Sequence, residues 1–124
     1  MDKADKRKYP RLSMNVEVKY EILSASSLKT KKIWAKNISA GGLCIMILEK
    51  IKVGTLLNLE FFLQDSDIPI MATGKVVWIE KIAIYSTEIY VSYDCGVEYV
   101  DINSQDQEKI DHYVMLNIKE VHPT

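Results

Sequence analysis

The chain has 124 residues, 48% of them hydrophobic, and a formal net charge of −1. These values suit one globular domain and exclude a disordered or collagen-like chain. No apolar run reaches the roughly 18 residues of a membrane-spanning helix, and the charged start is unlike a signal peptide. We therefore expect a cytoplasmic domain without membrane insertion. The near-neutral charge gives little attraction to a nucleic acid polymer, so any anion site must be local.

The first half of the chain predicts three strands and a glycine turn. Polar and apolar residues alternate without error over residues 14–22, which is the pattern of a half-buried strand. Residues 33–38 form a second β-rich segment, and residues 43–48 form a short apolar run. Gly41 and Gly42 separate these two segments, so we expect a hairpin there.

The second half of the chain predicts three further strands and one helix. Gly74 interrupts a β-rich segment and indicates a bulge or a barrel corner. Ser104 and Gln107 have the spacing of a capping box, and apolar residues follow them at helical intervals. The strands are expected at residues 56–63, 68–82 and 87–100, and the helix at residues 104–118.

Short turns between the strands, with no helix among them, favour an all-β fold. We expect a six-stranded antiparallel barrel of meander-like order with one C-terminal α-helix, because closure removes exposed strand edges. The chain is expected to form a single domain over residues 1–118. This domain would comprise a mobile arm at residues 1–12, the barrel at residues 13–100 and the helix at residues 104–118, followed by a tail at residues 119–124.

The residue types that carry catalysis or hold metals are scarce and scattered. His112 and His122 lie in the C-terminal helix or tail, far in the sequence from any nucleophile. Cys44 and Cys95 form no CxxC pair, so buried reduced thiols are favoured over a disulfide or a metal site. We therefore expect neither an enzyme nor a metal protein.

The arginines form the first candidate binding motif. Arg7 and Arg11 are the chain's two arginines and lie four residues apart in one segment. Guanidinium groups make bidentate hydrogen bonds to phosphate and to the O6/N7 edge of guanine, which lysine cannot imitate. Pro10 favours an extended conformation around them. Taken alone, such a segment is more often a disordered basic terminus than a binding site.

The turn at residues 37–42 forms the second candidate motif. Asn37 offers an amide with donor and acceptor groups, and Ser39 offers a hydroxyl. Gly41 and Gly42 would let the backbone approach a flat ligand closely. Taken alone, this sequence is also a good hairpin turn, so the pairing of both motifs carries the functional hypothesis.

Together these motifs resemble the signature of the PilZ domain family. Arg7 and Arg11 match its Arg-x-x-x-Arg motif, and the turn matches its Asp/Asn-x-Ser-x-x-Gly motif. The segments 74–78 and 96–100 are similar to the family's glycine-to-tryptophan strand and closing strand. The resemblance spans roughly residues 7–117. The matching positions of the second motif are Asn37, Ser39 and Gly42.

The resemblance implies a PilZ-type split barrel in a bacterial receptor for cyclic di-GMP. Its expected ligand-binding residues are Arg7, Arg11, Asn37, Ser39, Gly41 and Gly42. Nucleotide would order the arm and relay the signal to an unidentified protein of motility, secretion or exopolysaccharide machinery. The alternative is a PilZ-like protein-interaction barrel that binds no nucleotide.

Overall fold

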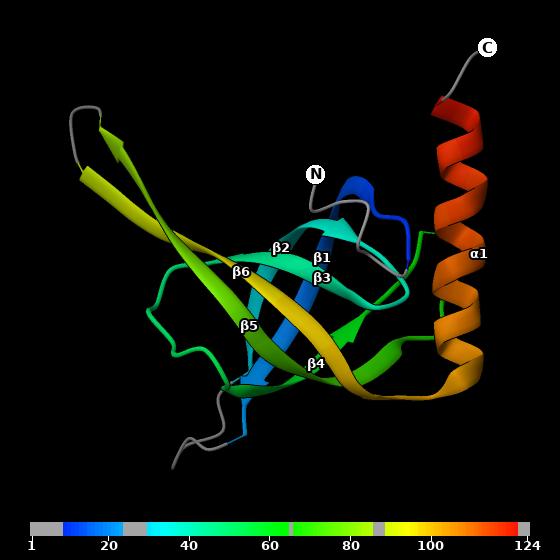
Figure 1. Cartoon of the computed structure of the whole chain (residues 1–124), viewed down its shortest axis with the longest axis horizontal. Coiled ribbons are helices and arrows are strands. Elements are labelled where there is room, and N and C mark those ends of the chain that lie inside the picture. The colour runs from blue at the N-terminus through cyan, green and yellow to red at the C-terminus, as the bar shows by residue number, and fades with distance from the viewer. Residues whose placement is uncertain (1–8, 24–29, 65, 86–88, 122–124) are drawn as a thin grey trace, which may run out of the picture.

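The computed structural model describes residues 9–23, 30–64, 66–85 and 89–121, and it shows a closed barrel of six antiparallel strands with one helix (Figure 1). The expected fold class is confirmed, including the C-terminal helix. In chain order the elements are β1 (Leu12–Ile22), β2 (Lys31–Ile38), β3 (Gly42–Ile47), β4 (Leu56–Phe61), β5 (Ile70–Tyr85), β6 (Ile89–Ile102) and α1 (Ser104–Val121).

The strands form where polar and apolar residues alternate, because a barrel strand has one face toward the core and one toward water. In β1, Val16, Val18 and Tyr20 are buried, whereas Asn15 and Glu17 are exposed. The ends of several strands differ from the prediction by a few residues. Hydrogen bonding to the neighbouring strand, which the side-chain pattern does not encode, determines where each strand ends.

The order of the strands around the barrel is β1-β2-β3-β6-β5-β4, so the expected meander-like order is wrong. β3 pairs with β6, and β4 closes the barrel against β1 with Leu59 opposite Tyr20. Local turns predict which sequence neighbours can pair. Closure removes open sheet edges in either order, so the pairing of distant strands depends on contacts that no local turn encodes.

β5 and β6 form a long hairpin that extends past the barrel on the side away from α1 (Figure 1). The strand pairing shifts between Thr73 and Gly74 and again between Val76 and Trp78. The first shift lies at the predicted bulge. A Cβ at Gly74 would lie 2.4 Å from the side chain of Val97, so a glycine is needed for close packing there.

The helix α1 is capped by Asn103, whose side-chain oxygen accepts a hydrogen bond from the backbone N–H of Gln105 at 2.8 Å. Asparagine is a favoured residue at this position. The expected capping box of Ser104 and Gln107 is wrong, because the Gln107 side chain bonds to the barrel instead. The start of α1 is therefore tied to the turn between β2 and β3.

One hydrophobic core fills the barrel and includes the inner face of α1. Ile110 and Val114 are fully buried, and burying such a side chain contributes about 1.5–3 kcal/mol. The hydroxyl of Tyr113 donates to the side-chain oxygen of Gln64 at 3.2 Å. These contacts hold α1 against the barrel. Within the described residues, no helical segment combines the length and apolarity needed to cross a membrane.

Candidate functional site

Five of the six site residues predicted from the sequence gather where β1 begins and where β2 turns into β3. The register of β1 and β2 places Ser13 opposite Asn37, so Arg11, just before β1, reaches the same place. Arg11 Nη1 donates a hydrogen bond to Asn37 Oδ1 at 3.0 Å. This bond fixes the guanidinium beside the turn. Arg7, the other predicted arginine, lies outside the described residues.

The turn between β2 and β3 is held by the buried hydroxyl of Ser39. Its oxygen accepts hydrogen bonds from the backbone N–H groups of Gly41 and Gly42 at 3.1 and 3.2 Å. The hydroxyl also donates to the Gly42 carbonyl at 3.2 Å. These bonds occupy the hydroxyl within the turn. Ser39 therefore shapes the candidate site, while its contact with a ligand stays a prediction.

We expect Ser39→Ala to lower the free energy of unfolding by about 1 kcal/mol, because two backbone N–H groups lose their acceptor. Urea denaturation measures this change. The control is Ser13→Ala, which removes an exposed hydroxyl from β1 and should change the free energy by less than about 0.5 kcal/mol. Equal effects of the two substitutions would show that the turn does not depend on the Ser39 hydroxyl.

Gly41 and Gly42 differ in how tightly their surroundings exclude a side chain. A Cβ at Gly42 would lie 2.0 Å from the carbonyl oxygen of Val97, so β3 could not approach β6 as closely. A Cβ at Gly41 would lie 3.1 Å from the ring of Tyr9, which a small shift of the ring could relieve. Gly42 is thus required for strand pairing, and Gly41 lets Tyr9 pack against the turn.

A depression of about 570 Å³ opens beside this turn, a volume typical of small-molecule sites. Arg11 lines it together with Ser39, Gly41 and Gly42. The guanidinium of Arg11 lies next to a glycine turn whose backbone a ligand can approach. This arrangement suits an anion that also has a planar, hydrogen-bonding part. The remaining walls are formed by Tyr9, Val77, Gly96, Val97, Glu98, Tyr99 and Gln107.

Two residues that sequence patterns do not indicate hold the turn from outside. The backbone N–H of Tyr99 in β6 donates to the Gly41 carbonyl at 3.0 Å. The side-chain Nε2 of Gln107 in α1 donates to the Ala40 carbonyl at 2.8 Å. Alternation along β6 indicates only packing for Tyr99, and the spacing at Gln107 indicates only a cap. The turn is thus connected to the closing strand and to the helix.

Trp78 and Gly96 lie opposite each other on β5 and β6. A Cβ at Gly96 would lie 2.0 Å from the indole Nε1, so the indole lies across the glycine. Trp78 remains 41% exposed, and Gly96 lines the depression. The segments 74–78 and 96–100, which resemble two strands of the PilZ family, therefore lie next to each other beside the candidate site.

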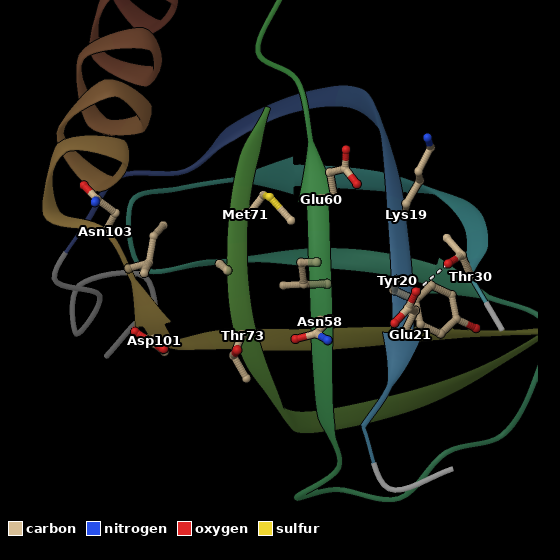
Figure 2. A pocket seen from close by; sticks show the side chains of 13 residues that line it. Lys19, Tyr20, Glu21, Thr30, Asn58, Glu60, Met71, Thr73, Asp101 and Asn103 are labelled. Carbon is tan, nitrogen blue, oxygen red and sulfur yellow. Dashed lines mark hydrogen bonds between the residues drawn. The ribbon is translucent and has the colours of Figure 1, made fainter. Parts of the chain in front are cut away.

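A second depression, of about 350 Å³, lies over β1, β4, β5 and the end of β6 (Figure 2). Its lining includes the carboxylates of Glu21, Glu60 and Asp101 but a single cation, Lys19. Thr30 Oγ1 donates to Glu21 Oε1 at 2.5 Å. This excess of negative charge disfavours a phosphate-bearing ligand. We therefore assign the candidate anion site to the depression beside Arg11.

The described residues contain no group of histidine, cysteine or acidic side chains arranged to hold a metal ion. Cys44 and Cys95 are buried free thiols, so the disulfide alternative is wrong. Burial raises the pKa of both, that of Cys95 to about 11, which makes them poor nucleophiles near neutral pH. His112 is exposed on α1, and His122 lies outside the described residues.

Comparisons with known proteins identify similar chains. The family model described as the PilZ domain matches residues 5–116. Bacillus subtilis inhibitor of motility (MotI/DgrA) has a similar structure, with a TM-score of 0.76 at 19% identity over 94% of this chain and 53% of that chain. MrkH of K. pneumonia in complex with c-di-GMP gives a TM-score of 0.72 at 19% identity over 92% and 53% of the two chains.

The PilZ domain of YcgR from Escherichia coli, solved with c-di-GMP, matches along most of both chains. The TM-score is 0.70 at 10% identity, over 93% of each chain. By contrast, this chain spans about half the length of MotI and MrkH. No curated protein matches the sequence. Identities this low establish a common fold, so the ligand has to be argued from the residues of the site.

Proposed function

Because the chain belongs to the PilZ domain family, we propose that it is a receptor for cyclic di-GMP and has no enzymatic activity. One arrangement carries the proposal. Asn37 holds Arg11 beside the turn of residues 39–42, at the wall of a depression of about 570 Å³. The structures of YcgR and MrkH with c-di-GMP support the choice of ligand.

Each proposed site residue has a role that its chemistry suits. Arg11, together with Arg7, binds the O6/N7 edge of guanine and the phosphates. The side-chain oxygen of Asn37 is engaged by Arg11, which leaves its NH₂ group as the donor for a guanine acceptor. Ser39 and the adjacent glycines shape the backbone against which the base lies.

The proposed output is a change of surface in the bacterial cytoplasm. Cyclic di-GMP would bridge the two arginines and fix residues 1–11 across the depression, which creates a surface that another protein can recognise. Residues 1–8 lie outside the described residues. The partner is an unidentified protein of motility, secretion or exopolysaccharide machinery.

Amide hydrogen exchange with and without cyclic di-GMP tests the ligand and the relay together, with GMP as the control nucleotide. We expect added protection at residues 39–42, because the ligand covers the turn, and at residues 5–11, because the arm becomes ordered. Added protection at the turn alone would contradict the proposed ordering of the arm but would still support cyclic di-GMP binding. No change at either segment would reject the receptor and favour the protein-interaction barrel.

A further inference from the structure

The hydroxyl of Tyr99 is a buried polar group that the fold leaves without a partner. Tyr99 lies on β6 and lines the depression that Arg11 also lines. Its hydroxyl oxygen is shielded from solvent and makes no hydrogen bond within the described part of the chain. Native proteins rarely keep an unpaired buried hydroxyl, because it costs stability. The residue that carries it lines the proposed nucleotide site, and the charge of Arg11 acts on it.

The surroundings of this hydroxyl determine which kind of partner it can take. Burial raises the pKa of Tyr99 well above the ordinary value, and the nearby charge of Arg11 offsets only part of this effect. The phenol therefore keeps its proton at neutral pH and can donate it. A guanidinium also offers only donors. An atom that satisfies both groups must be a hydrogen-bond acceptor.

Two other polar groups at the turn already have partners within the chain. The hydroxyl of Ser39 is bonded inside the turn, and the Ala40 carbonyl accepts from Gln107. Unlike these two groups, the Tyr99 hydroxyl has an unused donor. Its oxygen is shielded from solvent, so a ligand can reach it only after the site rearranges.

We propose that Tyr99 is a further ligand-binding residue, whose hydroxyl donates a hydrogen bond to an acceptor atom of bound cyclic di-GMP beside Arg11. The inference rests on the proposed function and adds a residue outside both motifs of the family resemblance. It also gives the closing strand β6 a direct part in binding, besides the backbone bond from Tyr99 to Gly41.

The test is Tyr99→Phe, which keeps the ring and removes only the hydroxyl. Calorimetric titration with cyclic di-GMP should show a dissociation constant roughly three- to tenfold higher, the loss expected for one hydrogen bond. The melting temperature without nucleotide should stay the same or rise, because the variant no longer buries an unpaired hydroxyl. The matched control is Tyr93→Phe on the same strand, outside the residues that line the depression, which should bind like the unmodified chain.

The outcomes separate this inference from the proposed function. If the unmodified chain binds cyclic di-GMP and Tyr99→Phe binds it equally well, the inference about Tyr99 is wrong, while the proposed receptor function is still supported. A clear fall in the melting temperature of Tyr99→Phe would also overturn it, since the hydroxyl would then be stabilising the fold itself. Failure of the unmodified chain to bind would overturn the proposed function and the inference together.

Discussion

Replacing Arg11 with alanine is expected to weaken cyclic di-GMP binding roughly ten- to a hundredfold in calorimetric titration. Arg11 is the cation among the described walls of the depression. Losing a charge-assisted hydrogen bond costs about 1.5–3 kcal/mol, which corresponds to this fold-change. The free energy of unfolding should fall less, by about 0.5–1.5 kcal/mol, because the partly buried bond to Asn37 is also lost.

Two further variants show whether this effect belongs to the site. Arg11→Lys keeps the positive charge but lacks the planar fork, so it should recover only part of the affinity. Lys19→Ala removes a cation from the second depression (Figure 2) and should leave binding unchanged. Unchanged affinity in Arg11→Ala would place the ligand elsewhere on the molecule.

Replacing Gly42 with alanine is expected to lower the free energy of unfolding by about 3 kcal/mol, the upper end of the usual cost of overpacking. The added Cβ would lie 2.0 Å from the carbonyl oxygen of Val97. This neighbour is backbone, so no side-chain rotation relieves the contact, and β3 would have to move away from β6. Urea denaturation measures the change.

Gly41→Ala is the matched control for this substitution. Its Cβ would meet the ring of Tyr9 at 3.1 Å, and a side chain can shift by the few tenths of an ångström required. The control should therefore lose less than about 1 kcal/mol. A Gly42→Ala variant as stable as the unmodified chain would show that β3 and β6 do not need this close approach.

Much of the fold could be predicted from the sequence, because burial on one face of a strand leaves a local pattern. The alternation in β1 and the helical spacing in α1 are such patterns. The strand order could not be predicted, since the pairing of β4 with β1 and of β3 with β6 is one of several ways to close the barrel. The choice among these ways involves the whole chain and leaves no signal in any one segment.

The candidate site was predictable where its residue types are chemically distinctive. Arg11 and Asn37 belong to separate motifs, and the structure joins them by a hydrogen bond. Tyr99 and Gln107 were not predictable as parts of the site. Each donates to a backbone carbonyl of the turn, and a backbone partner far away in the sequence imposes no pattern on the residues around the donor.

Calorimetric titration of the unmodified chain with cyclic di-GMP tests the central claim most directly. The receptor proposal predicts saturable binding that weakens with added salt, because arginine–phosphate contacts contribute. Cyclic di-AMP should bind far more weakly, since adenine replaces the O6 acceptor of guanine with an amino donor. If the folded chain gives no saturable heat with cyclic di-GMP at two different temperatures, the account is contradicted.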